Sequence, residues 1–183
     1  MRLNNKLIPV LFAMVICPMF LAGCDETLTP EQETVVSYIS GTSGKVARIS
    51  FSTFELADST TVAEELDRRK ALFSTKVKVE SGYKSEKHRQ SAAQAEAILA
   101  GIETLRQDLS SSLDDVLYRT WKFSCKGKFE DGGEFECRDM YINITRDGVA
   151  CNLKNDGRYH NGMGRFIPGY SELLEKNRIT EDE

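Results

Sequence analysis

The pattern of apolar residues changes from helical to strand-like near residue 118, and this change constrains the fold more than any other feature of the chain. Before it, the segment from Lys84 to about Ser110 places apolar residues at alternating steps of three and four, as along one face of a helix. These residues are Ala95, Ile98, Ile102, Leu105 and Leu109. After it, apolar and polar residues alternate with the period of a half-buried strand. The sequence therefore predicts an α+β domain in which an antiparallel helical hairpin packs with a small antiparallel β-meander.

The second helix of the hairpin is expected from about residue 60 to 80, joined to the long helix near Ser81-Gly82. Strict alternation from Thr75 to Glu80 leaves a strand there as the alternative. The adjacent acids Glu64 and Glu65 follow several candidate cap residues, so we interpret them as ordinary negative charge at a helix N-terminus.

Shorter patterns predict elements on both sides of the hairpin. A strand is expected from Lys45 to Leu56, where apolar and polar residues alternate. A short helix is expected from Pro30 to about Ser40, with Thr29 as its cap and Gly41 at its end. Leu113, Val116 and Leu117 are expected to continue the helical region after a break at Ser110–Ser112.

Three strands follow, separated by turns rich in Asp and Gly. We expect them at Tyr118–Phe129, Glu134–Thr145 and Val149–Leu153. The apolar parity of the second strand switches near Arg138-Asp139, which predicts a β-bulge. Residues 155–170 are expected to form a long loop, and residues 171–176 a short helix.

The first 24 residues combine a basic start, a short apolar stretch and the exit sequence Leu21-Ala22-Gly23-Cys24. This combination resembles the signal peptide and lipobox of bacterial lipoproteins. The resemblance implies cleavage before Cys24, lipid on Cys24 and anchoring of the mature chain to a membrane by that lipid. The apolar stretch of about 16 residues, Leu7 to Ala22, is shorter than the roughly 20 that a spanning helix needs.

Asp25 follows the lipobox cysteine, and it resembles the residue that retains lipoproteins in the inner membrane of enteric bacteria. The resemblance implies a position on the periplasmic side of the inner membrane, with the outer membrane as the alternative. We therefore divide the chain into a signal peptide (1–23), a lipid-proximal tether (24–30), a single periplasmic domain (31–176) and a polar tail (177–183).

Three cysteines lie within the predicted meander, in a compartment where disulfides persist if the lipoprotein resemblance holds. Cys125 and Cys137 are nearly opposite across the first turn, and we favour a disulfide between them. Pairing of Cys151 with either one remains open. The spacings match neither a CxxC dithiol nor a structural zinc site, so no metal and no cofactor is expected.

The net negative charge of the chain excludes the class of globally basic nucleic-acid-binding proteins, and we expect no nucleic-acid partner. The chain carries −4, and loss of Arg2 and Lys6 with the signal peptide leaves 22 basic and 28 acidic residues, a net −6. The predicted hairpin turn is locally basic around His88. This pattern is typical of a solvated surface, or of a contact for an acidic partner, a phospholipid headgroup or an anionic glycan.

The segment 158–165 is the strongest candidate for a ligand-binding loop. Arg158, His160 and Arg165 are side chains of a kind that binds ligands, and they lie among glycines that let a backbone approach a ligand closely. The segment lacks the pattern of a phosphate-binding or dinucleotide-binding loop, and the chain contains none of the common catalytic motifs that we considered.

These observations favour a lipid-anchored envelope protein that binds or scaffolds another envelope component, and an enzymatic role is not favoured. The long apolar seam packs against its own hairpin or offers part of its face to another chain. The alternative is a periplasmic small-ligand binder or enzyme that uses the 158–165 loop.

Overall fold

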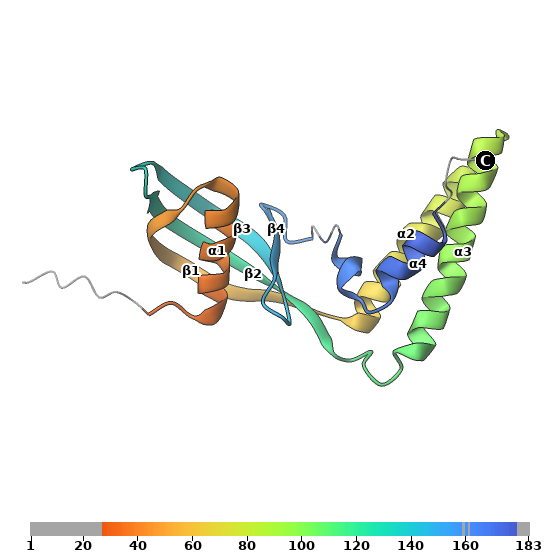
Figure 1. Cartoon of the computed structure of the whole chain (residues 1–183), viewed down its shortest axis with the longest axis horizontal. Helices are drawn as coiled ribbons and strands as arrows, with labels where there is room; N and C mark the ends of the chain where they lie inside the picture. Colours follow the sequence, from red (N-terminus) through yellow and green to blue (C-terminus); the bar gives the residue numbers. More distant parts are fainter. Residues whose placement is uncertain (1–26, 159, 161, 179–183) are drawn as a thin grey trace, which may run out of the picture.

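The computed structural model describes residues 27–158, 160 and 162–178. Within these residues the chain forms four α-helices, one 3-10 helix and a four-stranded antiparallel sheet, which confirms the α+β prediction. Figure 1 shows an elongated molecule with the sheet and α1 at one end and the hairpin of α2 and α3 at the other. The elements are α1 Pro30–Ser43, β1 Val46–Thr61, α2 Val62–Glu80, α3 Glu86–Asp108, β2 Val116–Phe129, β3 Glu134–Thr145, β4 Ala150–Lys154, η1 Met163–Phe166 and α4 Tyr170–Lys176.

The sheet contains one more strand than the predicted meander. Its order is β1-β2-β3-β4, because β1 pairs with β2 from Val46 opposite Phe129 to Thr61 opposite Val116. β1 therefore extends five residues beyond the predicted end at Leu56 and runs directly into α2. Local alternation marked this strand, but only the long-range pairing determines where it lies and how far it extends.

The predicted helical continuation at 113–117 is wrong, because Val116 already begins β2. The reason lies in the start of α2, whose first backbone N–H groups have no partner within the helix. Val62 N donates to the Asp115 carbonyl at 3.0 Å, and Ala63 N donates to the Leu113 carbonyl at 2.9 Å. These bonds hold the segment in a non-helical path beside the start of α2.

Three other expectations can be compared directly with the backbone. The alternative strand at 75–80 is wrong, since α2 continues to Glu80. α1 continues through Gly41 to Ser43, so its predicted end was too early. The predicted loop at 155–170 contains the short helix η1, and the expected helix at 171–176 is confirmed as α4, which begins at Tyr170.

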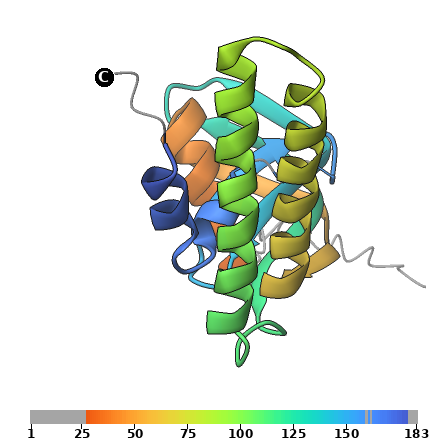
Figure 2. The same cartoon turned by 90° about the vertical axis from the view of Figure 1, so that its right-hand side faces the viewer.

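Two separate apolar clusters stabilise the two ends of the molecule. In the first, Val35 and Ile39 of α1 cover one face of the sheet, against Phe123 of β2 and Ile142 of β3. In the second, the hairpin helices pack with Tyr118 of β2 and with the segment that leads into α4. Figure 2 shows α2 and α3 side by side, with α4 beside α3.

The predicted seam of α3 is covered by the chain itself. Ala95, Ile98 and Ile102 are buried, and Leu105 and Leu109 are half-buried against the same cluster. Gly101, a weak point for a helix by propensity, lies directly under Leu173 of α4. An added Cβ there would lie 2.1 Å from Leu173 Cδ1, so the absence of a side chain allows α4 to pack on α3.

We expect Gly101→Val to lower the free energy of unfolding by about 1–3 kcal/mol, because a side chain at this position forces α4 away from α3. Ala100→Val is the matched control, since Ala100 is the exposed neighbour on the same helix. Urea unfolding of both variants measures the difference. Equal losses in the two variants would show that the Gly101 contact does not hold α4 in place.

Candidate functional site

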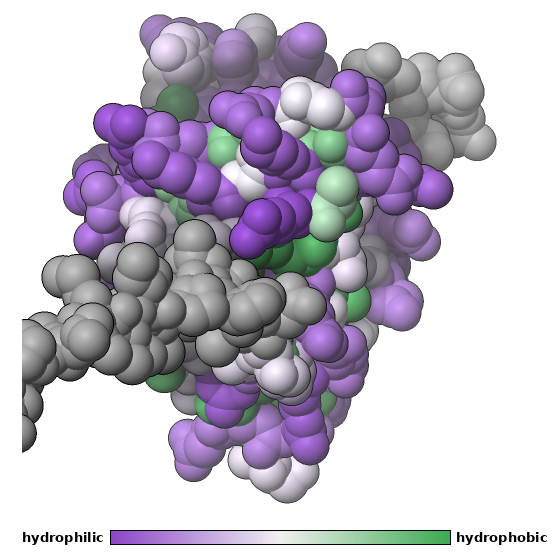
Figure 3. All heavy atoms as spheres, turned by 90° about the vertical axis from the view of Figure 1, so that its left-hand side faces the viewer, coloured by the Kyte–Doolittle hydropathy of each residue, from purple (hydrophilic) through white to green (hydrophobic). Residues whose placement is uncertain are grey.

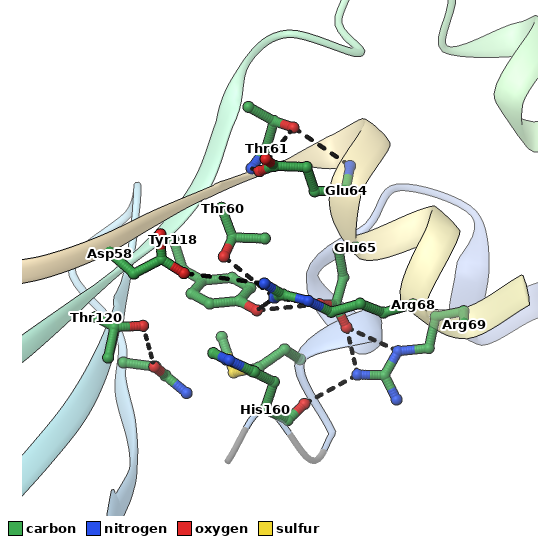
Figure 4. Close-up of polar contacts among 12 residues, drawn as sticks. Asp58, Thr60, Thr61, Glu64, Glu65, Arg68, Arg69, Tyr118, Thr120 and His160 are labelled. Atoms are coloured by element: carbon green, nitrogen blue, oxygen red, sulfur yellow. Dashed lines mark hydrogen bonds and ion pairs between the residues drawn. The ribbon is translucent and has the colours of Figure 1, made fainter. Parts of the chain in front are cut away.

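A polar cluster with a buried centre joins the sheet to the helical hairpin (Figure 4). We define this junction cluster as Asp58, Thr60, Glu65, Arg68, Arg69, Tyr118 and His160. A capping box fixes the start of α2: Glu64 N donates to Thr61 Oγ1 at 3.3 Å, and Thr61 N donates to Glu64 Oε2 at 2.8 Å. The next residue, Glu65, then faces inward toward the tyrosine on β2.

Glu65 is the centre of the cluster and has 0% solvent exposure. Arg69 Nε donates to its Oε1 at 2.7 Å, and the Tyr118 hydroxyl donates to its Oε2 at 3.0 Å. Arg68 Nη1 lies 3.4 Å from the same Oε2. A buried carboxylate is tolerated when it is paired and hydrogen-bonded, and two guanidinium groups and one hydroxyl meet that requirement here.

Tyr118 links the sheet to Glu65 and Arg68 of α2. Its hydroxyl accepts from Arg68 Nη1 at 2.5 Å, and Arg68 also donates to Thr60 Oγ1 at 3.2 Å. Burial is the main cause that raises the pKa of Tyr118 well above its usual range. The tyrosine therefore stays neutral and keeps the proton that it donates to Glu65.

The C-terminal segment enters the cluster through His160. Arg69 Nη2 donates to the His160 carbonyl at 2.9 Å, and the imidazole lies 5.7 Å from the Tyr118 ring, centroid to centroid. Burial is the main cause that lowers the pKa of His160. Its Nδ1 is buried without a hydrogen-bond partner among the described residues. The cluster thus ties α2, β2 and the 155–168 segment together.

The other two residues of the predicted ligand loop have separate partners. Arg158 Nε lies 3.3 Å from Asp156 Oδ1 in an exposed pair. The Arg165 guanidinium lies over the Phe166 ring at 4.8 Å from its centroid. The contacts of Arg158, His160 and Arg165 therefore do not make them a single ligand-binding group.

The connection between α2 and α3 carries a second group of polar and aromatic side chains. We define the hairpin tip as residues 76–89, which contain five basic and two acidic residues. His88 is hydrogen-bonded to Glu80 through Nδ1 and stacks on Tyr83, with 4.4 Å between ring centroids. The hydrogen bond from His88 is the main cause that lowers the pKa of Glu80. The second acid, Glu86, pairs with Arg89.

The cysteines are divided between the two apolar clusters. Cys125 and Cys137 lie opposite each other across β2 and β3, and the structure contains all three described cysteines as free thiols. Cys151 belongs to the other cluster. Cys24 and Asp25, with the proposed signal peptide and residue 26 of the tether, lie outside the described residues, as do residues 179–183 of the tail.

Residues 27–158, 160 and 162–178 include no helix that is both long and apolar enough to span a bilayer. The same residues contain no cluster of three or more His, Cys, Asp or Glu side chains with the arrangement of a metal site.

Sequence patterns missed the centre of the junction cluster. The interpretation of Glu65 as ordinary N-terminal charge is wrong, although Glu64 beside it does act at the cap. A usable signal was present: Glu65 and Arg69 occupy positions on the helical face defined by Val62 and Leu66. Two charged residues four apart on an apolar face indicate a buried ion pair.

Comparison of the chain with protein-family models, curated proteins and solved structures found no match.

Glu65→Gln should lower the free energy of unfolding by roughly 3–5 kcal/mol, because it removes the fully buried carboxylate charge that pairs with Arg69 and Arg68. Glu64→Gln is the matched control at the adjacent, exposed position, and we expect it to cost below about 1 kcal/mol. Chemical denaturation monitored by circular dichroism measures both. Similar small losses would mean that the junction cluster contributes little to stability.

Proposed function

We propose that the protein is a lipid-anchored envelope protein that binds or scaffolds another envelope component from the periplasmic face of the inner membrane. The hairpin tip is its contact surface. One observation carries this proposal. The described chain begins at the sheet end of the molecule, and the hairpin tip lies at the opposite end (Figure 1).

A lipid on Cys24 and the elongated shape of the molecule would together place the hairpin tip away from the membrane. The tether from Cys24 to Thr29 spans at most about 20 Å when extended, which keeps the sheet end near the lipid. α3 is roughly 34 Å long at 1.5 Å per residue, and Figure 1 shows it running steeply across the long axis of the molecule, up to the tip at the end away from the sheet. The junction cluster fixes the hairpin relative to the sheet, so the tip is held rather than freely swinging.

Charge supports an acidic partner at the tip. Residues 76–89 carry a net +3, whereas the mature chain carries −6. Both acids of the tip are already paired, and the described residues provide no ion-pair partner within 4 Å for Lys78, Lys84 or Lys87. A basic end on an acidic molecule orients and accelerates the approach of an acidic surface.

Exposed side chains at the tip add contact area to this charge. Tyr83 is 56% exposed and Val79 is 53% exposed. By contrast, the sheet end in Figure 3 is mostly hydrophilic, and its strand pairs are matched in charge, as in Lys126 with Glu136 and Lys128 with Glu134. The hairpin tip is therefore better suited to bind a partner than the sheet surface.

The small-ligand alternative gains less support, because Arg158 and Arg165 have partners of their own and His160 faces the junction cluster.

Cys24→Ala should abolish incorporation of labelled fatty acid and release the protein from the membrane fraction. The reason is that the proposed anchor is the lipid on this residue. Asp25→Ser should keep the label and shift the protein toward the outer-membrane fraction. A Cys24→Ala variant that remained lipid-labelled would exclude the proposed anchor.

A photo-crosslinking amino acid at Tyr83 should capture a partner in cells of the source bacterium. The control position is Leu56 on β1, which is similarly exposed at 50%. Lys84→Glu with Lys87→Glu should abolish the adduct from Tyr83, because these changes reverse the charge beside it. Adducts from Leu56 but not from Tyr83, or adducts unaffected by the charge reversal, would exclude the hairpin tip as the contact surface.

A further inference from the structure

We propose that Cys125 and Cys137 form a cross-strand disulfide, in which Cys137 reacts first with the oxidant and Cys125 closes the bond. The two residues are direct partners in the antiparallel register of β2 and β3. Residues opposite each other in such a ladder have Cα atoms about 4.5–5.5 Å apart, which falls in the range that a disulfide spans. The two thiols lie close enough for each to shift the pKa of the other.

The β-bulge is what makes this pairing possible. From Tyr118 to Phe123 the two strands follow one register, which ends with Phe123 opposite Met140. Continued unchanged, that register would place Arg138 opposite Cys125. The irregularity between Phe123 and Cys125 shifts the register by one residue and brings Cys137 there instead.

Local contacts fix the bulge at Arg138-Asp139, as the parity switch in the sequence predicted. Asp139 adopts φ 47°, and its N–H donates to Ser124 Oγ at 3.0 Å. Lys122 Nζ lies 3.1 Å from Asp139 Oδ1. The register of the cysteine pair therefore depends on contacts that do not involve sulfur, and the reduced chain already holds both thiols in position.

The order of reaction follows from the different environments of the two thiols. Cys125 is 1% exposed, whereas Cys137 is only half-buried and can meet an oxidant. Interaction with Cys125 lowers the pKa of Cys137, whereas the same interaction and burial raise the pKa of Cys125. The thiolate is the reactive form, so Cys137 is the better nucleophile near neutral pH.

The chemistry is thiol–disulfide exchange with a disulfide oxidant, either oxidised glutathione or an oxidised dithiol carrier protein. The Cys137 thiolate attacks one oxidant sulfur, forms a mixed disulfide and expels the other as a thiolate. Cys125 loses its proton and attacks the Cys137 sulfur, which expels the second oxidant thiolate. Two protein thiols become one disulfide, and the oxidant gains two electrons and two protons as two thiols.

Cys151 is excluded from either pairing by its position. Its Sγ donates to the Asn143 carbonyl at 3.7 Å and lies 3.3 Å from Met163 Sδ, within the cluster at the hairpin side of the sheet. Asn143 is its register partner, and the flanking Ile142 and Ile144 belong to the cluster that contains Cys125 and Cys137. Alternate residues of a strand point to opposite faces, so Cys151 lies on the other face.

Peptide mapping of the full chain, extracted from membranes under thiol-blocking conditions, tests the pairing directly. Trypsin separates the three cysteines into peptides 123–126, 129–138 and 147–154. We expect the first two linked to each other and the third carrying the blocking group. A link that includes peptide 147–154, or blocking groups on both Cys125 and Cys137, would overturn the proposal.

Reaction with oxidised glutathione tests the order. Cys125→Ser leaves Cys137 available and should form a mixed disulfide at least tenfold faster than Cys137→Ser, which leaves only Cys125 of the pair. Cys151→Ser is the control and should retain the linked peptides. Faster reaction of Cys125 would reverse the proposed order.

Discussion

The buried carboxylate of Glu65 is the interaction on which the rest of the structure depends. A carboxylate without solvent requires compensating donors, and its donors come from two separate parts of the chain: Arg68 and Arg69 on α2, and Tyr118 on β2. Arg69 in turn binds the His160 carbonyl, which adds the C-terminal segment. Movement of α2 relative to β2 or to the C-terminal segment would break the hydrogen bonds from Tyr118 to Glu65 and from Arg69 to the His160 carbonyl, and it would leave buried polar groups without those partners. The sheet end and the hairpin end are therefore held together by these buried hydrogen bonds as well as by apolar packing.

This requirement gives the proposed function its physical basis. The two apolar clusters stabilise opposite ends of an elongated molecule, and a flexible connection between them would let the hairpin tip sample many positions. Fixing the junction gives the tip a defined position relative to the end that the proposed lipid would anchor. The basic charge and the exposed Tyr83 would then face the proposed acidic partner. The Gly101 contact contributes to the same rigidity, because it packs α4 onto the outer side of α3.

Local patterns in the sequence predicted much of the fold and little of the candidate site. The α3 seam, the bulge at Arg138-Asp139 and the opposition of Cys125 and Cys137 are visible because each depends on residues close together in sequence. The pairing of β1 with β2 is not, since the paired residues lie far apart in sequence, from Thr61 with Val116 to Val46 with Phe129. The path of residues 113–117 was mispredicted because the unpaired N–H groups of Val62 and Ala63 determine it. Glu65 was missed because its burial depends on Tyr118, which lies 53 residues away.

The central claim is that the junction cluster holds the hairpin tip at a fixed position relative to the sheet. Pulsed electron–electron resonance between spin labels at Asp131, in the turn between β2 and β3, and Val79, near the tip, measures this most directly. Labels introduced through unnatural amino acids leave the cysteines untouched. The account predicts one narrow distance distribution in the native protein and a broad one in the Glu65→Gln variant. A broad distribution in the native protein would contradict it.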